Sequence, residues 1–177
     1  RNDFGNLIQR SFIVQENGQF SVNWSPLLAS LDSDNDGVTN GQELQDPFGL
    51  FSTGEANPGN PDLVTNAGLS SSSPLTTLTV NFSGMTPHVG QVLWLRVFDK
   101  INQKEVGRTS ISVSESFNVT IDAILPGSNY NIDFFADHNG NGEYDAPPTD
   151  HAWRIELDNA EGDDVVDFVH NTNFTDI

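Results

Sequence analysis

One stretch, residues 32–43, constrains this chain more than any other, because its residue types and spacing specify a metal-binding chemistry. It reads Asp-Ser-Asp-Asn-Asp-Gly-Val-Thr-Asn-Gly-Gln-Glu. Counted from its first Asp, it has oxygen-bearing side chains at positions 1, 3, 5, 9 and 12, and Gly37 at the sharp turn of position 6, as in an EF-hand-type calcium loop. The predicted ligands are Asp32, Asp34, Asp36, the Val38 carbonyl, Asn40 and Glu43.

The alternative interpretation of this stretch is a solvated acidic turn. Such a turn needs neither the glycine at position 6 nor the glutamate at position 12, and both are present. A hard cation with six to eight oxygen ligands would also offset the repulsion between carboxylates spaced this closely. We therefore expect Ca²⁺ as a bound cofactor.

Short helices are expected on both sides of the loop. Phe4, Leu7, Ile8 and Phe12 recur at helical spacing after an Asn-Asp capping signal. A second helix is expected to begin after Ser25 at Pro26 and to lead into the loop, followed by a short turn that ends before Pro47. We expect residues 1–51 to form a small helical calcium-loop module.

These residues carry a family resemblance. The N-terminal third of the chain resembles the temptin-type module. The resemblance rests on Arg1-Asn-Asp-Phe-Gly5, on Trp24, and on the acidic loop with its continuation Leu-Gln-Asp-Pro47. That family is named for a secreted molluscan pheromone protein, and the resemblance implies a secreted chain that binds calcium. Members usually carry a disulfide around the loop, whereas this chain has no cysteine near Ala29, after Pro47 or anywhere else.

Composition narrows the classes of partner. The chain has 7 Lys+Arg against 25 Asp+Glu, a net charge of −18, so it should repel nucleic acids and anionic membrane surfaces. Without cysteine, thiolate metal sites and disulfides are excluded. No apolar run has membrane-spanning length, and the sequence begins with Arg1 rather than Met, so we expect a processed, secreted protein without membrane insertion.

The character of the chain changes after residue 51. Residues 52–74 are rich in Gly, Pro, Ser and Asn, which predicts a linker or extended strap. Seven short runs with period-two alternation follow, separated by turn residues. These runs are residues 75–82, 91–99, 105–113, 116–124, 129–136, 152–157 and 164–169. The expected fold class is α+β and mainly β, with residues 75–177 forming an antiparallel β-sandwich of about seven strands, immunoglobulin-like or transthyretin-like.

A second loop, residues 137–145, follows one of the predicted strands and resembles a truncated calcium loop. It lacks the glutamate at position 12, so Asp150 would have to reach back toward the ion. The predicted ligands of this second Ca²⁺ site are Asp137, Asn139, Asn141, the Glu143 carbonyl, Asp145 and Asp150. The alternative is a tight Asn-Gly turn held by its own side chains.

No catalytic motif is recognisable, so we expect no enzyme: the chain has no Gly-x-Ser-x-Gly, no phosphate-binding glycine loop and no His-Glu-x-x-His. Its four histidines, at 88, 138, 151 and 170, follow no standard metal motif, although a copper or zinc site using His138 and His151 is an alternative to ordinary structural roles.

The sequence therefore predicts a secreted, calcium-stabilised, non-enzymatic protein with a structural or adhesive role. Its expected partners are calcium and either itself or another extracellular protein. The main alternative is a secreted signalling or ligand-binding protein of the pheromone-complex type.

Overall fold

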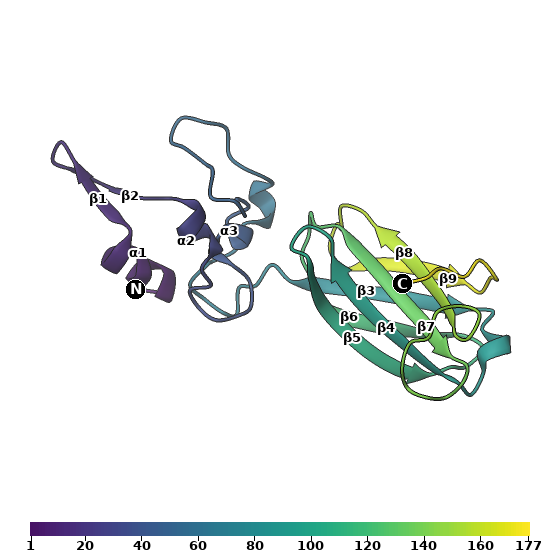
Figure 1. Ribbon diagram of the computed structural model, residues 1–177. Coiled ribbons are helices and arrows are strands. Elements are labelled where there is room, and N and C mark those ends of the chain that lie inside the picture. The colour runs from purple at the N-terminus through teal and green to yellow at the C-terminus, as the bar shows by residue number, and fades with distance from the viewer. The chain divides into compact units, whose positions relative to one another are not determined.

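The computed structural model describes the backbone of residues 1–177 and the side chains of residues 1–122 and 124–177. The chain divides into two compact units, Arg1–Pro74 and Leu75–Ile177. Short helices lie in the first unit and two β-sheets form the second, so the mainly β fold class is confirmed (Figure 1). Within the described residues, no helix has the length and apolar character needed to cross a membrane.

The first unit begins with helix α1, Asp3–Ser11, followed by a two-stranded hairpin. The Asn2 side chain caps the helix by accepting a hydrogen bond from the Gly5 amide. The hairpin, β1 Ile13–Glu16 and β2 Gln19–Val22, was not among the predicted strands. Its turn is Asn17-Gly18, and both residues have positive φ, 49° and 79°, as a two-residue hairpin turn requires.

Two short helices, α2 Pro26–Ser30 and α3 Asn40–Glu43, flank the loop of residues 32–39 as predicted. The Ser25 side chain caps α2, while Thr39 and Gln42 form a reciprocal capping box at the start of α3. The two helices approach each other closely at Gly41. A Cβ at this position would lie 2.8 Å from the Ala29 Cβ and 2.5 Å from the Asp46 carbonyl oxygen, so only glycine fits.

Residues 52–74 contribute to the first unit. They include a 3₁₀ turn, Pro61–Leu63, and the buried Ala67. The Thr65 amide donates a hydrogen bond of 2.9 Å to the Glu43 carbonyl, which joins this segment to the end of α3.

The second unit is a sandwich of two sheets, with seven strands that match the seven predicted runs. One sheet has the order β6-β3-β9 and the other β5-β4-β7-β8. All neighbouring strands pair antiparallel except β3 and β9, which are parallel. The strands are β3 Thr76–Ser83, β4 Val92–Asp99, β5 Lys104–Ser112, β6 Phe117–Ile124, β7 Tyr130–Asp137, β8 His151–Leu157 and β9 Asp164–Val169.

The core lies between the two sheets and includes a group of packed aromatic rings. Phe82 from β3 meets Phe134 from β7 edge to face, with ring centroids 5.1 Å apart, and Phe134 stacks on Trp153 from β8 at 5.7 Å. In β4, Leu93, Leu95 and Val97 are buried while the intervening residues are half-buried, as expected for an interior strand. Pairs of aromatic rings in these geometries add to the stabilisation from apolar burial.

Arg96 and Arg154 both bind Asp133, which is almost fully buried. The Arg96 Nη2 lies 2.8 Å from one carboxylate oxygen of Asp133 and the Arg154 Nε lies 2.6 Å from the other. The three residues come from β4, β8 and β7 and are cross-strand neighbours. These arginines therefore pair with a strand carboxylate in the four-stranded sheet.

Candidate metal centre

The loop between α2 and α3 is organised by its first residue, Asp32. One carboxylate oxygen of Asp32 accepts a hydrogen bond of 2.8 Å from the Asn35 amide, and the other accepts one of 3.0 Å from the Gly37 amide. Asn35 and Gly37 have φ of 61° and 94°, the left-handed region in which Gly and Asn are favoured. These two bonds fold the loop around the side chains that follow Asp32.

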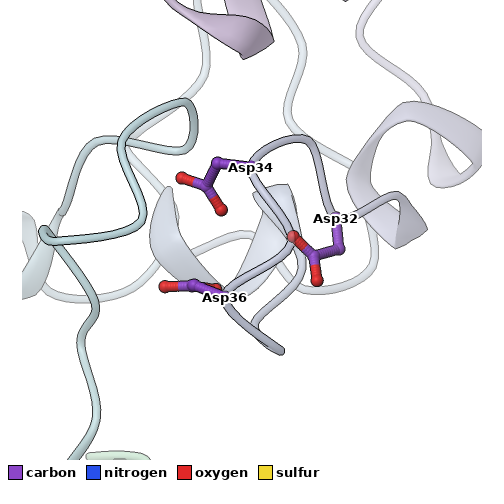
Figure 2. Close-up of side chains that lie close together, drawn as sticks. All are labelled: Asp32, Asp34 and Asp36. Carbon is purple, nitrogen blue, oxygen red and sulfur yellow. The ribbon is translucent and has the colours of Figure 1, made fainter.

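The loop brings three carboxylates together. Asp32, Asp34 and Asp36 each offer an oxygen, and these oxygens all lie within 4.8 Å of one another (Figure 2). In Figure 2, Asp32 and Asp34 direct carboxylate oxygens toward the space between them. A group of this kind could hold a metal ion.

Asp34 and Asp36 have buried oxygens without hydrogen-bond partners. Both oxygens of Asp34 and the Oδ2 of Asp36 are in this state, while the Asp36 Oδ1 accepts from the Val38 amide at 2.8 Å. Burial, followed by the charge of Asp36, raises the pKa of Asp34. Buried carboxylate oxygens need a hydrogen-bond donor, a proton or a cation as a partner, and a metal ion would supply one here.

Glu43, at the end of α3, interacts electrostatically with this acidic group, although among the described side chains its oxygens do not converge with those of Asp32, Asp34 and Asp36 within 4.8 Å. Its side chain is fully buried; one oxygen accepts a hydrogen bond of 3.1 Å from the Thr65 hydroxyl, and the other has no partner. Burial, together with the charges of Asp34, Asp36 and Asp32, raises the pKa of Glu43 to about 7, against the lowering effect of the hydrogen bond from Thr65. Glu43 is therefore electrostatically coupled to all three loop carboxylates.

Asn40, the predicted ligand at position 9, is also fully buried. The side-chain nitrogen Nδ2 of Asn40 donates a hydrogen bond of 2.9 Å to the Leu28 carbonyl, and the side-chain oxygen Oδ1 has no partner. Val38 has a buried side chain, and its amide bonds to Asp36. Asn40 and Glu43 therefore each keep one buried oxygen without a hydrogen-bond partner, as Asp36 does.

The sequence did not indicate the contact between Thr65 and Glu43. Thr65 lies 22 positions beyond Glu43, inside the segment predicted as linker or strap. No spacing rule relates a loop to a hydroxyl so far along the chain.

The second loop, residues 137–145, has the same internal hydrogen bonds as the first. The two oxygens of Asp137 accept from the Gly140 and Gly142 amides, three and five residues later, as those of Asp32 accept from the Asn35 and Gly37 amides. Gly140 and Gly142 also have positive φ, 73° and 78°. The Asn141 side chain accepts from the Glu143 amide as Asp36 accepts from the Val38 amide.

More of the side-chain oxygens of the second loop accept hydrogen bonds from groups within the protein. The side-chain Nδ2 atoms of Asn139 and Asn141 donate hydrogen bonds of 2.7 and 2.8 Å to the same carboxylate oxygen of Asp145. Asp150 is fully buried, and its two oxygens accept from the His138 and Asp145 amides. Among the described side chains, the carboxylates of this loop do not converge as Asp32, Asp34 and Asp36 do.

Comparison with known proteins bears on the first loop alone. Residues 2–69 match a protein family described as Temptin C-terminal. The match contains the whole acidic loop and Thr65 and ends before the sandwich, so it agrees with the resemblance inferred for the N-terminal third and extends it to residue 69. Searches of the curated proteins and of the solved structures found no match.

Proposed function

We propose that residues 32–43 bind calcium through the Asp32, Asp34, Asp36, Asn40 and Glu43 side chains and the Val38 carbonyl. The observation that carries this proposal is the state of Asp34, whose two buried oxygens accept no hydrogen bond of good geometry, although the nearby Asp36 and Leu69 backbone amides partly stabilise its charge. A cation would supply the missing partner. It would also allow Glu43 to ionise, which burial and three neighbouring carboxylates otherwise oppose.

The ligand chemistry favours calcium over other common ions. All the proposed ligand atoms are oxygens, which hard cations prefer, whereas zinc and copper prefer nitrogen or sulfur. The number of protein oxygens in one loop also suits Ca²⁺, which takes six to eight ligands. Mg²⁺ demands a tighter octahedron and usually retains several waters.

We propose a second and weaker calcium site in residues 137–145. Its support is the hydrogen-bond pattern that Asp137 and Asn141 share with the first loop. It would bind more weakly because two ligands, Asn139 and Asn141, are neutral and because the Asp150 oxygens are already engaged by backbone amides.

For the whole chain we propose a secreted, non-enzymatic, structural or adhesive role, with calcium making the acidic loops rigid. Several large apolar side chains of the first unit are exposed, and exposed apolar side chains that gather into one contiguous patch commonly mark docking surfaces. The exposed side chains are Ile13, Val14, Phe20, Val22, Leu27, Phe48, Leu50, Val64 and Leu69. The edge strands β5, β6, β8 and β9 are further surfaces for strand addition.

The alternative is a signalling or ligand-binding protein of the pheromone-complex type, which the family match over residues 2–69 favours. The two roles differ in the partner. A structural subunit associates with copies of itself. Each copy has a net charge of −18, so the copies repel one another, and calcium and salt should promote association by reducing that repulsion. A signalling protein stays monomeric and binds a distinct partner.

Sedimentation velocity across calcium concentrations, with and without a chelator, tests the assembly role. Larger species that form in calcium and dissociate on chelation support the structural subunit. A monomer at every calcium concentration, alongside intact calcium binding, contradicts self-assembly and favours the alternative.

A further inference from the structure

The four histidines of the chain meet in the sandwich unit, although they are far apart in sequence. His88 ends a 3₁₀ turn before β4, His138 follows β7, His151 begins β8 and His170 follows β9. The chain has no other histidine. The calcium proposal uses none of the four side chains.

His88 lies at the centre of the group and is almost fully buried. Its Nε2 is 3.2 Å from the Nε2 of His170 and 3.4 Å from the Nδ1 of His151. Around a tetrahedral ion with metal–nitrogen bonds of about 2.0–2.1 Å, neighbouring ligand nitrogens lie about 3.3–3.4 Å apart. Both distances agree with that spacing.

Gln91 determines which nitrogen of His88 is free. The Gln91 Oε1 lies 2.9 Å from the His88 Nδ1, so Nδ1 carries the proton in a neutral ring and Nε2 keeps its lone pair. The Gln91 Nε2 lies 3.0 Å from the His138 Nδ1, which ties His138 to the same arrangement. Metal-binding histidines are commonly oriented in this way, by a partner on the second ring nitrogen.

The surroundings favour neutral imidazoles. His151 stacks on Phe174 with ring centroids 4.1 Å apart, and Trp153 packs edge-on against His88 at 5.6 Å. Burial, and then the neighbouring histidines, lower the pKa of His151, and burial also lowers that of His88. Neutral rings have the lone pairs that a metal ion requires.

A purely structural role leaves one contact unexplained. The His88 Nε2 has a single in-plane lone pair, and it faces two other ring nitrogens. One N–H from His170 or His151 would satisfy that lone pair, and the second nitrogen would then have no good partner. A cation can accept lone pairs from all three nitrogens at once.

We propose that His88, His151 and His170 bind a divalent transition-metal ion of the imidazole-binding class, Zn²⁺ or Cu²⁺. The three nitrogens do not yet all lie within 4.8 Å of one another among the described side chains, so the ring of His151 or His170 turns inward when the ion binds. Both side chains are half-buried, which permits that rotation. Gln91 is a positioning residue, and His138 stacks on His151 at 5.4 Å beside the ion.

The test is calorimetric titration of the full chain with ZnCl₂ and with CuCl₂, in excess calcium so that the acidic loops are filled. We expect one saturable site per chain. Copper should bind more tightly than zinc, as in the general order of affinities of divalent metal ions for such ligands. His151→Gln and His170→Gln should each weaken binding more than Gln91→Leu, which should weaken it about 10–100-fold. Thr86→Ala, in the same turn as His88, is the matched control and should leave affinity unchanged.

Two readouts keep the test decisive if a variant folds poorly. Each variant must retain wild-type calcium binding, which reports an intact first unit, and a wild-type sandwich by far-UV circular dichroism. On the wild-type chain, the electron paramagnetic resonance spectrum of bound Cu²⁺ should show coupling to imidazole nitrogens. Absence of saturable binding of either ion, binding unaffected by both histidine variants, or a copper spectrum with oxygen ligands alone would overturn the proposal. None of these outcomes bears on the calcium loop.

Discussion

The Thr65 hydroxyl donates a hydrogen bond of 3.1 Å to the carboxylate of Glu43, and the Thr65 amide donates one of 2.9 Å to the carbonyl of the same residue. Two bonds therefore hold the segment after residue 52 against the last proposed ligand of the loop. Glu43 also has a second oxygen with no partner. Thr65 is thus placed to orient the proposed ligand Glu43.

Thr65→Val should weaken calcium binding about 10–100-fold, because partners that orient a ligand typically contribute that much to affinity. Valine keeps the shape of the side chain and removes only the hydroxyl. Thr53→Val, at an exposed turn position, is the matched control and should leave affinity unchanged. Equal calcium affinities for the two variants in a calorimetric titration would show that Thr65 does not orient Glu43.

The stability of the calcium-free protein should fall as pH rises from about 4.5 to about 7, because the pKa of Glu43 is about 7 in the folded chain against 4.5 in the ordinary case. Over that window the native state binds more protons than the unfolded chain, so deprotonation favours unfolding. The loss is at most about 3.5 kcal/mol, from about 2.5 pKa units at about 1.4 kcal/mol per unit.

Urea unfolding at several pH values, with chelator present, measures this dependence. Glu43→Gln should remove the part of that fall due to Glu43, because glutamine does not titrate, and leave only the part due to the raised pKa of Asp34. In the wild-type chain calcium affinity should increase with pH and level off above about pH 7, once Glu43 is ionised without help from the ion. A wild-type pH profile identical to that of Glu43→Gln would contradict this account.

Trp24→Phe should destabilise the first unit by about 1.5–3 kcal/mol, the usual value for a hydrogen bond to a charged group. The Trp24 Nε1 donates to the Asp46 carboxylate at 2.6 Å, and the Leu50 and Phe51 amides donate to the same carboxylate. Burial raises the pKa of Asp46, but these bonds outweigh burial and hold the pKa below its usual value.

This contribution of Asp46 is present above the unfolded pKa and is lost as pH falls through the lower folded value. Urea unfolding of Trp24→Phe at neutral and acid pH provides the measurement. The difference from wild type should shrink at acid pH, and a difference of constant size would argue against a charged acceptor.

The second loop should fill after the first in a calcium titration. Asp137→Ala should abolish only the weaker phase and Asp32→Ala only the tighter one, because each residue organises its own loop through two backbone amides. Calcium titrations of the two variants assign the phases. A tighter phase that disappears in Asp137→Ala would reverse the proposed order.

The elements visible to sequence analysis are those with local signals. Period-two runs bounded by turn residues located all seven strands of the sandwich, and cap residues such as Ser25 located the short helices. The hairpin after α1 was missed although Asn17-Gly18 is a standard turn signal, because its strands are exposed and carry no clear two-faced pattern.

Contacts between distant residues were not predictable in the same way. The parallel pairing of β3 with β9 and the hydrogen bond between Thr65 and Glu43 depend on the folded chain. The grouping of four histidines depends on it too: spacing along the sequence left them as isolated residues, and only the topology of the sandwich places His88, His151 and His170 side by side.

Calorimetric titration of Asp34→Asn with calcium, beside wild type and Asp62→Asn, tests the central claim most directly. Asparagine preserves shape and removes one charge at a residue whose two oxygens are buried and accept no hydrogen bond of good geometry. Asp62 is exposed and lies outside the acidic group. We predict saturable binding by wild type and Asp62→Asn, and a loss of about tenfold or more for Asp34→Asn, because ligand charge tunes calcium affinity. No calcium binding by wild type, or equal affinity in all three proteins, would contradict the proposed site.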